Sequence, residues 1–202
     1  MIDVAVGGIL FYIVNMENKD DIKLKVRNYI NVACDLLDIP TPYIHYNIPK
    51  YMKEQGKEIA TTIKKGNHYH VYLNIDYENK SILYNACLHE CRHVYQYIVC
   101  DSPMAYMIEP KELVEAWRNN LKCYTGNRIE NYELQPLELD AYAFGDYVYN
   151  TMYGQEMIVR KDFVRRALLK RMMELSGIYT EEEILSIASD YFNIEQKRPL
   201  YS

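Results

Sequence analysis

One short stretch of the chain combines residue types that can bind a metal ion and activate water. From His89 to His93 it reads H-E-C-R-H, an H-E-x-x-H pattern, within an apolar run over residues 81–99 that predicts a helix. Successive residues of a helix turn by about 100°, so both imidazoles point from one face and can bind the same ion. Glu90, beside them, could take a proton from a water molecule at the metal. These are the parts of a zinc-dependent hydrolase.

A third ligand is expected from a second element, because catalytic zinc commonly takes three protein ligands and one water molecule. Residues 135–145 are predicted to form a helix, and Pro136 suits its first turn. Glu138, Ala141 and Gly145 share one face of this helix. The two small residues would let the helix approach the histidines, so that Glu138 reaches the metal. The other interpretation of Glu138 is an exposed acid that favours the helix dipole.

The two motifs resemble those of gluzincin-type zinc metallopeptidases. An H-E-x-x-H helix followed by E-x-x-A-x-x-F from Glu138 is similar to the pattern of the compact minigluzincins, especially the ImmA/IrrE family, over residues 81–146. The resemblance implies that His89, His93 and Glu138 bind zinc and that Glu90 is the general base. It also implies a peptide or protein substrate, such as a regulatory protein that represses a mobile element.

The chain departs from that family at two points. The segment between His93 and Glu138 is longer, and Cys91 and Arg92 stand where the family has an aliphatic residue and a glycine. Helical spacing turns Cys91 away from the two histidines, so we expect this side chain to pack in the core and not to bind the metal.

Other side chains are alternative ligands or neighbours of the metal. His68 and His70 share one face of a predicted strand, where they could line the cleft, supply a third ligand, or face solvent. Solvent exposure is the commoner arrangement for such a pair and the one we expect. Glu130 and Glu133 are weaker third-ligand candidates, because no face of small residues accompanies them. His45, in a short apolar strand, is expected to be structural.

Peptide hydrolysis also needs a group that stabilises the developing oxyanion alongside the metal. Tyr142 follows Glu138 by one helical turn on the same face, which makes its hydroxyl a geometric candidate. Because the chain contains 21 tyrosines, the ordinary role of a packed aromatic side chain remains the expectation for Tyr142.

The elements around the motifs predict an α+β fold. A small N-terminal antiparallel or mixed sheet precedes a helical core that carries the HExxH and ExxA helices, and extra helices follow at the C-terminus. Strands are predicted over residues 43–48, 58–64 and 68–75, and a turn around Gly66 joins the last two as a hairpin. A helix over residues 18–38 comes before them.

The last predicted strand is expected to lie beside the zinc cleft. In that position it could hold an extended peptide by strand addition, in which backbone hydrogen bonds align the substrate with the edge of a sheet. Tyr72 and Asn74 would then contribute to peptide affinity without contributing to metal binding.

Two further regions are helical in the prediction. Residues 110–123 form a helix with Trp117 in the core, and the insert from 100 to 131 either covers the cleft or simply connects two helices. Residues 160–175 form a basic amphipathic helix, which could contact a nucleic acid or an acidic partner but more often packs on one side and is solvated on the other. Thr180 caps a last helix.

Composition limits the classes of protein. A chain of 202 residues fits a single domain, with a catalytic core over about 1–150 and a helical extension over 151–202. The net charge of −5 gives no general attraction for nucleic acid. Five cysteines without a C-x-x-C pattern indicate a reduced, cytoplasmic protein. The apolar segment Val4–Val14 is too short to span a membrane and is expected to be a strand or a short helix.

We therefore expect a zinc metallopeptidase in which Glu90 activates the attacking water. The alternative is a zinc-binding regulatory or interaction module without peptidase activity. A third possibility, a helical nucleic-acid binder that uses the surface of residues 160–171, is opposed by the acidic charge of the chain.

Overall fold

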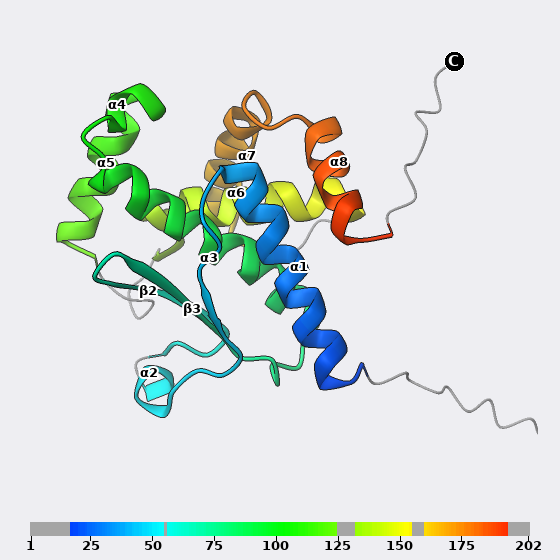
Figure 1. The fold of residues 1–202 in the computed structure, drawn as a ribbon. Helices are drawn as coiled ribbons and strands as arrows, with labels where there is room; N and C mark the ends of the chain where they lie inside the picture. Colours follow the sequence, from blue (N-terminus) through cyan, green and yellow to red (C-terminus); the bar gives the residue numbers. More distant parts are fainter. Residues whose placement is uncertain (1–16, 55, 125–131, 155–159, 194–202) are drawn as a thin grey trace, which may run out of the picture.

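The chain folds into a small sheet and a larger set of helices, which confirms the predicted α+β class (Figure 1). The predictions for the segment Val4–Val14 and for Glu130 concern residues outside the described part of the chain. The computed structural model describes residues 17–54, 56–124, 132–154 and 160–193.

The sheet is mixed and has three strands. They are β1 (Tyr43–His45), β2 (Ala60–Lys65) and β3 (His68–Leu73), arranged in the order β1-β3-β2. β2 runs antiparallel to β3, and Gly66 makes the predicted hairpin turn between them with a φ of +60°, a value that favours glycine. β1 runs parallel to β3, and α2 (Lys50–Glu54) lies in the crossover that parallel pairing requires. β3 is therefore the central strand, and β2 is a terminal one.

The central helix is α3 (Lys80–Asp101), which carries the H-E-x-x-H motif. It packs against β2 and β3 on one side and against α6 (Pro136–Tyr153) on another, while α1 (Lys19–Leu37) lies across it (Figure 1). Buried residues occur around most of α3, as the apolar run predicted. A helix in this position brings polar side chains into the interior, where each needs a hydrogen-bond partner or a metal ion.

Capping residues begin the helices where the sequence predicts. The side chain of Asn18 accepts hydrogen bonds from the backbone N–H groups of Asp20 and Asp21, both at 2.9 Å, at the start of α1. Thr180 accepts one from the N–H of Glu183 at 3.2 Å and so begins α8 (Glu181–Tyr191). Pro136 stands in the first turn of α6, as expected.

The outer helices contribute to two separate apolar clusters. Trp117 of α5 (Lys111–Lys122) is fully buried, as predicted, in a cluster to which α4 (Ala105–Ile108) also contributes. α7 (Asp162–Ser176) packs on α6 through Val164 and Leu168, whereas Arg166 on its other side is exposed, which confirms the amphipathic pattern. A short 3₁₀ helix, η1 (Tyr132–Leu134), precedes α6.

Two compositional expectations can be compared with the structure. All five cysteines are unpaired thiols, and Cys91 is completely buried in the core, as expected. Among the described helices, none combines the length and the apolar character needed to cross a membrane.

Candidate metal centre

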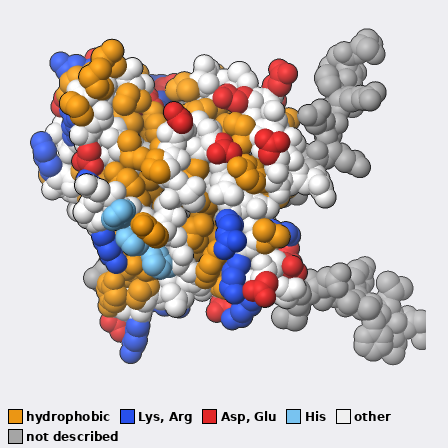
Figure 2. All heavy atoms as spheres, viewed as in Figure 1, with side chains coloured by type: hydrophobic (Ala, Val, Ile, Leu, Met, Phe, Trp, Pro, Cys, Tyr) orange, Lys and Arg blue, Asp and Glu red, His pale blue; other side chains and the backbone are white. Residues whose placement is uncertain are grey.

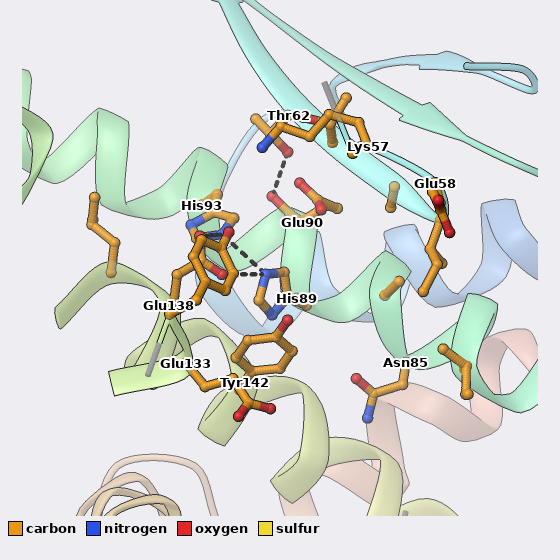
Figure 3. Close-up of a pocket in the computed structure, with 18 of the residues that line it drawn as sticks. Lys57, Glu58, Thr62, Asn85, His89, Glu90, His93, Glu133, Glu138 and Tyr142 are labelled. Carbon is orange, nitrogen blue, oxygen red and sulfur yellow. Dashed lines mark hydrogen bonds and ion pairs between the residues drawn. The ribbon is translucent and has the colours of Figure 1, made fainter. Parts of the chain in front are cut away.

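α3 and α6 bring the three predicted ligands together (Figure 3). The Nε2 atoms of His89 and His93 are 3.0 Å apart, and each is 3.4 Å from a different carboxylate oxygen of Glu138. One ligand atom from each residue can be chosen so that all lie within 4.8 Å of one another. Two imidazole nitrogens and a carboxylate in this arrangement could hold a metal ion.

The close approach of the two helices depends on Gly145, as the sequence suggested. A Cβ atom at Gly145 would lie 2.9 Å from Oδ1 of Asn85 and 3.4 Å from the backbone nitrogen of His89. The side chain of Asn85 cannot easily move away, because its amide donates a hydrogen bond to Asp146 at 3.0 Å. Ala141, the other small residue on this face, is fully buried.

The electrostatics of the cluster suit a cation. Burial alone would lower the pKa of His93, but the carboxylate of Glu138 outweighs it and raises the pKa to about 9. Burial alone would raise the pKa of Glu138, but the adjacent imidazoles of His93 and His89 hold it well below its usual range. Oε2 of Glu138 makes no hydrogen bond, although the residue is only 1% exposed. A divalent ion would satisfy this buried oxygen and both Nε2 atoms.

Glu90 lies next to the cluster, between α3 and the sheet (Figure 3). Its backbone carbonyl accepts a hydrogen bond from the hydroxyl of Thr62 on β2 at 3.0 Å. Its side chain borders the cleft, and carboxylate oxygen Oε2 has no hydrogen-bond partner. The carboxylate is therefore available to accept a proton, while the strand holds its backbone in place.

A cleft of about 610 Å³ opens over the cluster. Residues 56–62, which lead into and form the first part of β2, line one wall, and Tyr142 of α6 lies on the opposite side (Figure 3). The prediction that β3 borders the cleft is wrong, because β1 and β2 flank this strand on both sides. Tyr72 and Asn74 consequently do not line the cleft.

Tyr142 is close enough to the cluster to be relevant to its chemistry. Its ring packs against the ring of His89 with centroids 4.4 Å apart, and the guanidinium of Arg160 lies 5.0 Å from the centre of the tyrosine ring. Burial and the charge of Glu138 raise the pKa of the Tyr142 hydroxyl. The hydroxyl therefore stays protonated, and as a neutral group it can donate a hydrogen bond to an oxyanion.

Sequence reasoning missed a second tyrosine at the site. The hydroxyl of Tyr124 donates a hydrogen bond to Oε1 of Glu138 at 2.7 Å and lies 2.6 Å from the hydroxyl of Tyr132. Tyr124 falls in the stretch 100–131, for which a cover over the cleft and a simple connection were both considered, and Tyr132 follows directly after it. Nothing in the sequence distinguishes these two tyrosines from the others. The insert thus contributes to the cleft through Tyr124, and residues 125–131 lie outside the described part.

The alternative ligands lie elsewhere. His68 is exposed and His70 is half-buried on the outer face of the sheet, where histidine side chains gather in Figure 2, so the solvent-exposed arrangement is confirmed. His45 is also partly exposed, and its Nε2 lies 3.0 Å from Nδ1 of His70. Glu133 lines the cleft but forms an ion pair with Arg160 at 3.2 Å.

The geometry of this chain is the evidence for the site. Comparisons with protein-family models, with curated proteins and with solved structures found no match. In the part of the chain that the structure describes, His89, His93 and Glu138 form the one group of three potential ligands close enough to share a metal ion.

Proposed function

We propose that this protein is a zinc-dependent metallopeptidase, similar in its site to the gluzincins and especially to the ImmA/IrrE family. The observation that carries the proposal is the convergence of His89, His93 and Glu138 below an open cleft, with a carboxylate that has a free oxygen beside them. Bound zinc would lower the pKa of a water molecule and polarise the scissile carbonyl.

Glu90 is the general base in this proposal. A carboxylate in its position accepts the proton of the attacking water and then delivers it to the leaving amine. The unpartnered oxygen supports this role, because it leaves Glu90 an oxygen that can contact a water molecule at the cluster. The alternative function, zinc binding without hydrolysis, gives Glu90 no chemical task.

The substrate in this proposal is an extended peptide that lies along β2. Residues 56–62 line the cleft, and β2 is a terminal strand whose outer edge no described strand covers. A peptide segment could pair with this edge through its backbone and so pass over the cluster. As in the family that the motifs resemble, the natural substrate would be a regulatory protein.

The first test combines metal analysis with two substitutions. Glu90→Gln should keep zinc in a one-to-one ratio and lower the rate of peptide hydrolysis by about 10²–10⁴-fold, because only proton transfer is lost. Glu138→Gln should weaken zinc binding itself. Cleavage of a mixture of unstructured peptides, read by mass spectrometry, measures hydrolysis. Glu112→Gln, the same change at an exposed position of α5, is the matched control.

Two results would overturn the proposal. Normal hydrolysis by Glu90→Gln would exclude this residue as the base. A wild-type protein that binds zinc but cuts no peptide in the mixture would favour the zinc-binding regulatory module instead.

A further inference from the structure

The second ring nitrogen of His93 has a well-defined partner. Nδ1 of His93 lies 2.8 Å from Oε1 of Gln96, which is three residues further along the same face of α3. Gln96 is only 1% exposed, so water does not compete for this contact. The site therefore includes a hydrogen bond on the side of the ring that faces away from Glu138.

The contacts of Gln96 determine which way its amide points. Its nitrogen Nε2 lies 3.0 Å from the carbonyl oxygen of Leu137 and 2.7 Å from Oδ2 of Asp140. A carbonyl and a carboxylate only accept hydrogen bonds, so the NH₂ group must face these two oxygens. The amide oxygen must then face His93.

This orientation selects one tautomer of His93. An oxygen that only accepts, 2.8 Å from Nδ1, requires Nδ1 to carry the hydrogen. In the neutral ring, Nε2 is then left with its lone pair, and Nε2 is the atom that faces Glu138 and His89. The hydrogen bond at Nδ1 thus makes Nε2 the nitrogen of His93 that can bind a metal ion once the ring is neutral.

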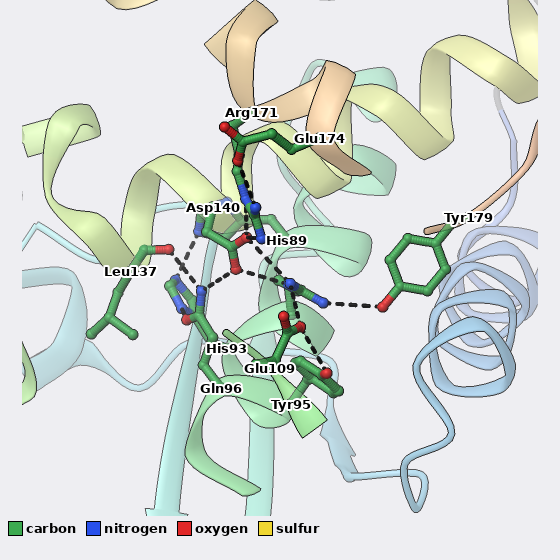
Figure 4. A network of polar contacts seen from close by, with 11 residues as sticks. His89, His93, Tyr95, Gln96, Glu109, Leu137, Asp140, Arg171, Glu174 and Tyr179 are labelled. Carbon is green, nitrogen blue, oxygen red and sulfur yellow. Dashed lines mark hydrogen bonds and ion pairs between the residues drawn. The ribbon is translucent and has the colours of Figure 1, made fainter. Parts of the chain in front are cut away.

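Asp140 is itself held from two sides (Figure 4). Arg92, which is fully buried, donates from Nε to Oδ2 at 2.8 Å and from Nη2 to Oδ1 at 3.2 Å. Arg171 of α7 donates to Oδ1 at 2.8 Å. With two guanidinium groups around it, Asp140 remains a charged acceptor for the amide of Gln96.

The same arginine joins more distant elements to the site. Arg92 also donates to the hydroxyl of Tyr179, between α7 and α8, at 3.2 Å, and lies 3.4 Å from Glu109, just before α5. Two arginines thus face two buried acids, Asp140 and Glu109, and Arg171 also pairs with the exposed Glu174 at 2.8 Å. Figure 4 shows Asp140 at its centre, with Gln96 and His93 to one side and Tyr179 to the other.

We propose that Gln96, held by Asp140, is the positioning residue that fixes the ring orientation and the tautomer of His93 for metal binding. The inference rests on metal binding in the proposed function but not on peptidase activity. Partners of this kind on metal-binding histidines commonly contribute about 10–100-fold to metal affinity.

Gln96→Leu tests this role, because it keeps the approximate side-chain volume and removes both hydrogen bonds, the one to His93 and the one to Asp140. Its dissociation constant for zinc, measured by competition with a chelator, should rise about 10–100-fold. Cobalt substituted for zinc should show an altered absorption spectrum, which a change in stability alone would not produce. Tyr179→Phe is the control: it removes one hydroxyl from the same network but no contact of Asp140, and should change affinity less than about twofold.

A measurement on the wild-type protein does not depend on whether a variant folds. In the zinc-loaded protein, the Nδ1–H of His93 should give a downfield proton resonance that exchanges slowly with solvent, because the hydrogen bond to buried Gln96 protects it. A rapidly exchanging proton there, or wild-type zinc affinity and cobalt spectrum in Gln96→Leu, would overturn the inference and leave the metal site standing. Failure of the wild-type protein to bind zinc would instead refute the proposed function.

Discussion

The two histidines of the motif are held in place by different means. His93 is the end of a chain of hydrogen bonds that runs through Gln96 and Asp140 to Arg92. Nδ1 of His89, in contrast, is buried without a hydrogen-bond partner, and its ring packs against Tyr142. Packing can fix where a ring lies, but only a directional partner can also fix which nitrogen carries the proton.

The largest loss of stability is expected when Arg92, at the far end of the hydrogen-bond chain that reaches His93, is replaced. Arg92→Leu would leave Asp140 and Glu109 buried without their central cation, which costs about 3–5 kcal/mol of unfolding free energy. Urea denaturation of the metal-free protein measures this loss. Replacing Arg92 and Asp140 together by Leu should recover only part of it, because the buried carboxylate of Asp140 is then removed with its cation, while Glu109 and Arg171 each still lose a partner. If the single variant is as stable as wild type, Arg92 does not hold this buried network together.

A smaller loss of stability is expected from a substitution near His89, the histidine that is held by packing. Gly145→Ala places a methyl group against Asn85 and the backbone of His89, and the strain should exceed the gain in helix propensity by about 1–2 kcal/mol. Zinc affinity should fall as well, because α6 carries Glu138 away from α3. Thermal unfolding and zinc titration measure the two effects. Unchanged values for both would show that the helices can separate without affecting the cluster.

The smallest effect on stability is expected at Tyr142. Tyr142→Phe keeps the ring that packs on His89 and removes only the hydroxyl, so stability should change by less than about 1 kcal/mol and zinc affinity should be unchanged. A decrease in the rate of hydrolysis with an unchanged Michaelis constant would assign the hydroxyl to oxyanion stabilisation. An unchanged rate would leave Tyr142 as a packing residue, which is what the sequence favoured.

Local features of the chain were readable from the sequence because they depend on near neighbours. The spacing of His89 and His93, the face shared by Glu138 and Gly145, and the cap at Asn18 all follow from helix geometry, and the structure has each of them. Gln96, three residues after His93, could have been found by the same spacing, but its amide is oriented by α6, which no local pattern places.

Features that depend on distant pairing were not readable. The position of β3 beside the cleft was predicted wrongly, because β1 has only three residues and its parallel pairing with β3 leaves no local signal. The roles of Tyr124 and Arg92 depend on side chains 14 and 48 residues away, at Glu138 and Asp140. The sequence could therefore indicate which groups form the possible metal site, but not most of the residues that hold these groups in place.

The hydrogen bond made by the Thr62 hydroxyl would affect which peptide bond of a substrate lies at the cluster. By donating a hydrogen bond to the backbone carbonyl of Glu90, it ties one residue of β2 to the residue proposed as the general base. A substrate strand aligned with β2 would therefore meet the carboxylate at a position set by its pairing offset. The cleaved bond would then be selected by its distance, in residues, from the segment paired with β2. The identity of any one side chain would matter less.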